Sequence, residues 1–111
     1  MDIESRKEPG AIVLALSGRM DALTAPEYEK KLKQLIDEGQ TGFVVDLAGL
    51  SYISSAGLRG ILTIAKMLKV KGGWIRFANV TGTVREVFDI SGFASLFQIH
   101  DSVASALQRM P

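Results

Sequence analysis

The chain begins with two apolar stretches that are separated by a turn signature. A weak strand pattern around residues 3–8 is followed by Pro9 and Gly10, which stand where the two central residues of a type II turn need them. The next apolar run covers residues 12–16 and ends at residues 17–18. We therefore predict that the chain opens with an antiparallel β-hairpin.

Two helices are predicted from capping signals at their first residues. Thr24 and Glu27, three residues later, form a capping box at the first helix. Thr83 and Glu86 repeat the pattern at the second, which Gly92 ends. The first helix, closed by Gly39, carries apolar residues at helical spacing: Tyr28, Leu32, Leu35 and Ile36.

Three further strands and two further helices complete the pattern. Residues 43–47 form an apolar run interrupted only by Asp46, as expected for a strand buried on both faces. Residues 74–78 and 96–99 predict two more strands. A loop through Gly49 leads to a helix that is expected to begin at residues 54–55, run to about Val70 and end at Gly72 and Gly73. A last helix is expected to be capped by Asp101 and to end near Met110.

This order of elements defines the fold class. From the second strand onward, strands alternate with helices, and right-handed crossovers then give a parallel sheet. The opening hairpin supplies one antiparallel pair. We predict an α/β fold with a mixed, mostly parallel sheet of about five strands and about four helices. A length of 111 residues suits a single domain covering residues 1–111.

Composition narrows the function classes. Thirteen basic and 12 acidic side chains leave a net charge of +1, which gives no reason to expect nucleic acid or an anionic membrane as partner. The chain has no cysteine and one histidine, His100, so it favours no metal or other cofactor. The first residues are polar and resemble no signal peptide, and no apolar run is long enough to cross a bilayer. We therefore expect a cytoplasmic protein.

Polar residues follow the predicted strands at the edge where parallel α/β sheets place their functional groups. Asp21 follows the second strand, Asp46 lies at the end of the third, and Ser54 and Ser55 begin the next helix. Either serine can be a helix N-cap and nothing more. A helix N-terminus also suits a bound or covalent phosphate, because its free amides and dipole favour negative charge.

The helix after these serines has an unusual predicted outer face. An inward stripe is expected from Leu58, Ile61, Leu62, Ala65 and Leu68. The opposite side then carries Gly60, Thr63 and Met67, flanked by Arg59 and Ile64. A small, weakly polar face beside a serine that can be phosphorylated predicts a docking site. The alternative is that this composition arose by chance.

Three segments carry a family resemblance: GRMD at residues 18–21, DLAGLSYISSAGL at 46–58 and VFDISGF at 87–93. They resemble the STAS domain of bacterial anti-sigma factor antagonists. The resemblance implies a non-enzymatic partner switch. The unmodified antagonist binds an anti-sigma factor that is also an ATP-dependent serine kinase, and phosphorylation by that kinase releases it. A serine phosphatase then restores the unmodified form.

The resemblance also implies roles for individual residues. The family acceptor usually follows an aspartate and precedes a small residue, glycine and leucine, which places it at Ser55 and puts Ser54 in the aspartate position. Asp21 and Asp46 match acidic positions that would hold the serine loop and repel an added phosphate. The expected partner-binding residues are Asp21, Asp46, Ser54, Ser55, Ala56, Gly57, Arg59, Gly60, Thr63 and Met67.

Two other functions compete with this interpretation. A serine hydrolase would need glycine two residues before and two after the nucleophile, but Ile53 stands at the first of these positions. A STAS interaction module without phosphorylation, such as a subunit of a lipid-transport complex, is the stronger alternative. The serine at the acceptor position favours the phosphorylation switch.

Overall fold

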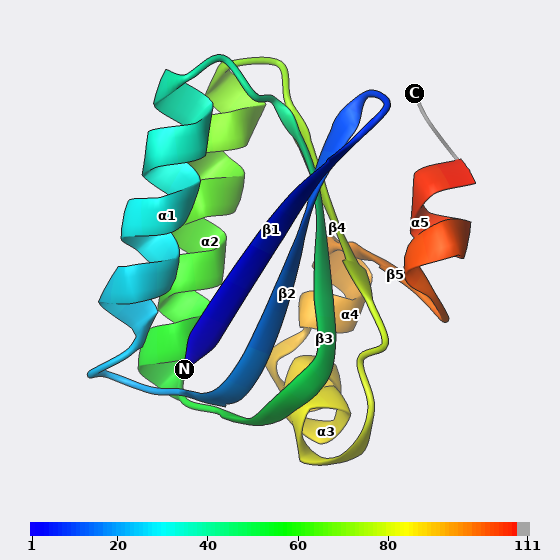
Figure 1. The fold of residues 1–111 in the computed structure, drawn as a ribbon. Coiled ribbons are helices and arrows are strands. Elements are labelled where there is room, and N and C mark those ends of the chain that lie inside the picture. The colour runs from blue at the N-terminus through cyan, green and yellow to red at the C-terminus, as the bar shows by residue number, and fades with distance from the viewer. Residues whose placement is uncertain (109–111) are drawn as a thin grey trace.

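A computed structural model describes residues 1–108 of the chain, and its centre is a five-stranded sheet in the order β1-β2-β3-β4-β5 (Figure 1). β1 pairs antiparallel with β2, and the other neighbouring strands are parallel. The predicted α/β class and mostly parallel sheet are therefore confirmed. The strands are β1 (Asp2–Glu8), β2 (Ala11–Met20), β3 (Gly42–Ile53), β4 (Trp74–Ala78) and β5 (Gln98–His100).

Helices lie on both faces of this sheet (Figure 1). Residues of α1, α2, α3 and α4 contribute to the larger core on one face, whereas α5 covers the other. Residues 1–108 thus contain five helices where about four were predicted, and the predicted helix end near Met110 lies outside the described residues. The helices are α1 (Ala25–Asp37), α2 (Ser55–Val70), α3 (Gly82–Ser91), α4 (Phe93–Leu96) and α5 (Val103–Gln108).

The opening hairpin is confirmed. Glu8 pairs with Ala11 across the two-residue turn. Gly10 has φ +79°, the value that the third residue of a type II turn requires and that glycine adopts without steric cost.

Alternation along the central strands builds the two cores. The larger core includes Leu14, Val45 and Phe77 on the face that carries α1 to α4. On the opposite face Val13, Val44 and Ala78 pack with Ala106 of α5. Arg76, only 5% exposed, donates a hydrogen bond of 2.8 Å from Nη1 to the Ala106 carbonyl, and its guanidinium lies 4.3 Å from the centre of the Trp74 ring. Buried polar groups need such partners, so this contact helps to hold α5 on the sheet.

No helix in residues 1–108 is long and apolar enough to cross a bilayer.

Two strands run further than their apolar stretches predicted. β2 continues past Gly18 to Met20, and the expected loop through Gly49 is instead part of β3. Ser17 pairs with Gly49, whose missing side chain allows the approach: a Cβ there would lie 2.8 Å from the Ser17 Cβ. The extension keeps pairing through register shifts around Ser17 and Gly18, which an apolar-run criterion cannot detect.

The predicted capping boxes are wrong. Thr24 precedes α1 but makes no side-chain cap, because its hydroxyl oxygen accepts the Asp21 N–H at 2.9 Å while its proton is donated to the Arg19 carbonyl at 2.8 Å. α3 begins at Gly82 after Thr81, which places Thr83 inside the helix.

The predictions near the C-terminus are also corrected. The strand expected at residues 96–99 starts at Gln98 because residues 93–96 form α4, and the Ser102 hydroxyl, not Asp101, accepts the Ser105 N–H at the start of α5.

Candidate functional site

The two serines at the start of α2 have different roles. Ser54 is the N-cap: its hydroxyl accepts the Gly57 N–H at 3.3 Å, and its own N–H donates to the Met20 carbonyl at 2.9 Å. Ser55 is the first helical residue and is exposed. Within residues 1–108 the Ser55 hydroxyl has no hydrogen-bond partner. The structure therefore leaves the Ser55 hydroxyl available for a reaction while Ser54 stabilises the helix end.

Gly57 lets the first turn of α2 lie against the ends of β2 and β3. The residue is buried, and a Cβ at this position would lie 2.7 Å from Ile53 Cγ1 and 3.0 Å from the Met20 carbonyl oxygen. Both distances are shorter than side-chain packing allows without displacement. Gly57 therefore fixes where Ser55 stands relative to the strands, and it is not free to contact a partner.

Asp21 organises the loop between β2 and α1. Its Oδ1 accepts the N–H groups of Leu23 at 3.0 Å and of Thr24 at 3.2 Å. Burial alone would raise the pKa of Asp21, but these hydrogen bonds, the Thr24 hydroxyl and the charge of Arg19 outweigh it and hold this pKa below its ordinary value. The carboxylate is thus charged at neutral pH and fixes the loop between β2 and α1, whereas the resemblance implied that it holds the serine loop.

Asp46 does not belong to this site. Its Oδ1 accepts hydrogen bonds from the Ala48 N–H at 3.0 Å and from the Asn79 side chain at 2.9 Å. β3 continues from Asp46 to Ile53, which at ~3.3 Å per residue is roughly 23 Å of strand. The expectation that Asp46 holds the serine loop and repels its phosphate is therefore wrong. Asp46, which lies within β3, is instead bonded to Asn79, the residue that follows β4.

The predicted outer face of α2 is also wrong. Gly60 and Ile64 are buried, and Met67 is partly buried against the larger core. The predicted inward stripe is largely confirmed, because Ile61 and Leu68 are buried and Leu58 and Leu62 pack against the larger core. The buried side is wider than predicted and also takes in Gly60 and Ile64. α1 packs alongside α2 and covers this side, as the position of Glu29 beside Gly60 shows. The side chains that α2 exposes are instead Ser55, Arg59, Lys66, Lys69 and Val70.

Met67→Glu tests this corrected register. Because Met67 packs against the core, a carboxylate there loses apolar contacts and must be partly desolvated. We expect the free energy of unfolding to fall by about 1–3 kcal/mol. Lys66→Glu, at an exposed neighbouring position, is the matched control and should change stability by no more than about 0.5 kcal/mol. Equal urea midpoints for the two variants would mean that Met67 is exposed and that the corrected register is wrong.

A shallow groove of about 270 Å³ runs between α1 and α2 next to Ser55. Exposed apolar surface adjoins it, because Leu23, in the loop held by Asp21, is 87% exposed. We call the patch formed by Ala22, Leu23, Ser55, Ala56 and Arg59 the Ser55 surface. Leu23 gave no periodic signal in the sequence, since it lies in a loop. The groove is lined by Ala22, Ala25, Pro26, Glu29, Ala56, Arg59 and Thr63.

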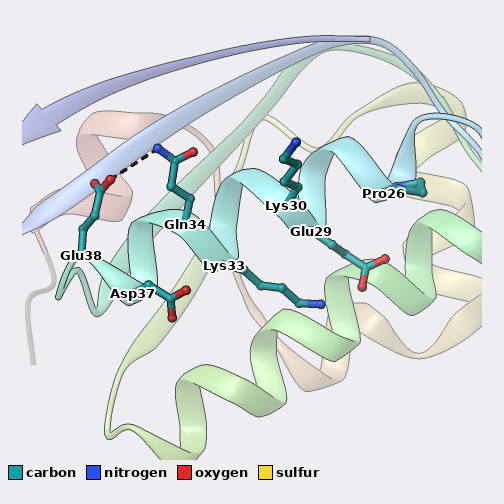
Figure 2. A pocket seen from close by; sticks show the side chains of 7 residues that line it. All are labelled: Pro26, Glu29, Lys30, Lys33, Gln34, Asp37 and Glu38. Atoms are coloured by element: carbon teal, nitrogen blue, oxygen red, sulfur yellow. Dashed lines mark hydrogen bonds between the residues drawn. The ribbon is translucent and has the colours of Figure 1, made fainter.

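A larger open space of about 710 Å³ lies along α1 but does not form a site (Figure 2). All of its lining residues come from α1 or the residue after it, and they carry charges of both signs. Figure 2 shows Glu29 and Lys33 extending toward α2, and Gln34 donates to Glu38 at 3.4 Å. Ligand sites are concave and combine groups that converge from several elements. Residues 1–108 also hold no group of three His, Cys, Asp or Glu side chains suited to a metal ion.

Comparison with known proteins gives the family. The profile of the STAS domain matches residues 2–106. BtrV of Bordetella bronchiseptica, described as a candidate anti-sigma factor antagonist, is 38% identical over 106 residues, which cover 96% of this chain and 91% of BtrV. The anti-sigma F factor antagonist of Paenibacillus polymyxa is 28% identical over 111 residues, covering 99% of this chain and 95% of that protein. The chain therefore belongs to the STAS domain family.

Solved structures agree with the fold. The anti-sigma factor antagonist SpoIIAA in its unphosphorylated form matches with a TM-score of 0.85 at 23% identity, covering 97% of this chain and 95% of SpoIIAA. The Bacillus SpoIIAA in its phosphorylated form matches with a TM-score of 0.77 at 22% identity, covering 97% and 98%. The five-stranded sheet and its helices are thus those of STAS proteins.

Proposed function

We propose that this chain is a cytoplasmic anti-sigma factor antagonist that is switched by phosphorylation of Ser55. Unmodified, it binds an anti-sigma factor with serine kinase activity. The kinase phosphorylates Ser55 and the complex dissociates, and a serine phosphatase then regenerates the binding form. The observation that carries this proposal is the exposed Ser55 hydroxyl, which has no partner within residues 1–108. The names of the family relatives support the class of partner.

The division of work between the serines supports Ser55 as acceptor. The Ser54 oxygen is already engaged by the Gly57 N–H as the cap of α2, whereas α2 does not use the exposed Ser55 hydroxyl. Phosphorylated SpoIIAA shows that a protein of this fold accepts such a group.

The switch follows from the charge that the phosphate adds. A phosphoserine carries about −1.5 to −2 charges at neutral pH. On the Ser55 surface this charge would have to lose its hydration when a partner covers Leu23 and Ala56. Asp21, held ionised in the adjacent loop, adds like-charge repulsion. Docking is therefore weakened by the modification itself, with no change of fold required.

Incubation with ATP and the anti-sigma factor kinase of the source cell should add one phosphate, located on Ser55 by mass spectrometry. Ser55→Ala should take up none. Ser54→Ala is the control for the neighbouring hydroxyl: it removes the cap and is expected to destabilise α2 by about 1 kcal/mol, yet it should still be phosphorylated. Phosphate found on Ser54, or uptake that survives Ser55→Ala, would falsify this assignment.

A further inference from the structure

Arg59 is an exposed cation one helical turn after Ser55. Side chains four residues apart on a helix are neighbours, with Cβ atoms roughly 5–6 Å apart. The ion pairs among residues 1–108 are Arg6–Glu8 and Arg85–Asp89, so the Arg59 guanidinium has no anionic partner there. It lines the groove that Ala22 and Ala56 also line, which places it within the Ser55 surface.

We propose that Arg59 holds the phosphate of modified Ser55 by an intramolecular ion pair, and that in the unmodified protein the same guanidinium binds a carboxylate of the partner. This inference rests on the proposed phosphorylation of Ser55. Its geometry is the favourable one, with the anion at the first position and the cation four residues later. A guanidinium also matches phosphate oxygens with two parallel hydrogen bonds, which an ammonium group cannot do.

The nearby acidic groups leave Arg59 available for this role. Glu29 of α1 lines the same groove, but its carboxylate forms no ion pair with Arg59 within 4.0 Å. Asp21 is engaged by the N–H groups of Leu23 and Thr24. Among cations, Arg19 lies 4.1 Å from the centre of the Tyr52 ring, on the strands and not on α2. Arg59 is thus the cation that α2 itself presents beside Ser55.

With Arg59 beside Ser55, phosphorylation releases the partner more effectively than it would through charge repulsion alone. In the unmodified protein, the exposed Arg59 guanidinium and the exposed Leu23 side chain offer a partner one charged and one apolar contact. The fitting partner surface has a carboxylate next to an apolar pocket. Phosphorylation adds a repulsive charge for that carboxylate and at the same time occupies Arg59. One modification therefore removes an attractive contact and introduces a repulsive one.

The test uses the full chain with phosphoserine incorporated at position 55 during translation, so that no kinase is needed. The second pKa of the phosphate is measured by ³¹P NMR titration, at low and at high salt. An adjacent guanidinium favours the dianion, so Arg59→Gln should raise this pKa by about half a unit or more relative to the unsubstituted phosphoprotein. High salt should shrink the difference. Arg85→Gln makes the same chemical change on α3, where Arg85 pairs with Asp89, and should leave the phosphate pKa unchanged.

Arg59→Lys should give an intermediate pKa, because it keeps the charge without the paired hydrogen bonds. If the phosphate pKa is the same in the Arg59→Gln and unsubstituted phosphoproteins, the proposed ion pair between Arg59 and the phosphate is wrong. An equal shift in Arg85→Gln would also contradict it, because that shift would reflect net charge alone. Either outcome leaves the proposed phosphorylation standing, since that stands or falls on whether the kinase modifies Ser55.

Discussion

Ser55→Asp is expected to bind the anti-sigma factor kinase roughly a hundredfold more weakly than the unmodified protein, whereas Ser55→Ala should bind it as tightly. The Ser55 hydroxyl makes no hydrogen bond within residues 1–108, so its removal costs the free protein nothing. A carboxylate in its place must be desolvated under the partner, beside the ionised Asp21. A loss of ~3 kcal/mol from these two effects corresponds to about a hundredfold in the dissociation constant.

Titration calorimetry with the kinase measures both variants directly. Ser55→Asn is the matched control, because it has the shape of aspartate without the charge. If Ser55→Asn loses as much affinity as Ser55→Asp, size rather than charge is responsible. Equal affinities for Ser55→Ala and Ser55→Asp would describe a constitutive interaction module, the alternative that the sequence left open.

Gly57→Ala is expected to lower the free energy of unfolding by about 1–3 kcal/mol, the usual range for overpacking a tight contact. The added methyl would lie 2.7 Å from Ile53 Cγ1, 3.0 Å from the Met20 carbonyl oxygen and 3.1 Å from Met20 Cγ. Neither the Met20 backbone oxygen nor the buried Ile53 and Met20 side chains, whose residues pair at the ends of β3 and β2, can move away easily. The whole first turn of α2, with Ser55, must shift instead.

Gly60→Ala is the matched control in the same helix. Its Cβ would lie 3.3 Å from Glu29 Oε2, the end of a flexible side chain that can move. Alanine also has a higher helix propensity than glycine by about 0.8–1.0 kcal/mol. Gly60→Ala should therefore be neutral or stabilising in urea unfolding. A Gly57→Ala protein as stable as Gly60→Ala would contradict the close packing at the start of α2.

Much of the fold could be predicted because several of its elements have a clear signal in the local sequence. Residues 74–78 were predicted as a strand and form β4, and Pro9 with Gly10 specified the hairpin turn. Ser54 and Ser55 were correctly placed at the beginning of α2. In each case the signal lies in the residues themselves: an apolar run interrupted only by Arg76, a fixed φ, or a hydroxyl at a helix end.

The predictions were wrong where contacts between elements, rather than the local sequence, determine the structure. The pairing of Ser17 with Gly49 continues β3 through the position where a loop was expected, and this is what separates Asp46 from the serines. The buried side of α2 is set by its neighbours, so Gly60 is buried beside Glu29 of α1 and Met67 is partly buried against the larger core, although their residue types fit an outer face. Thr24 stabilises the loop of Asp21 rather than the helix, because its hydroxyl accepts the Asp21 N–H and donates to the Arg19 carbonyl.

Reversible phosphorylation of the protein itself tests the central claim most directly. Protein carrying one phosphate on Ser55 is titrated into the anti-sigma factor kinase in the calorimeter without ATP. The same sample is then treated with a serine phosphatase and titrated again. We predict weak or undetectable binding before treatment and full affinity, equal to that of never-phosphorylated protein, afterwards. Equal affinity before and after treatment would contradict the account.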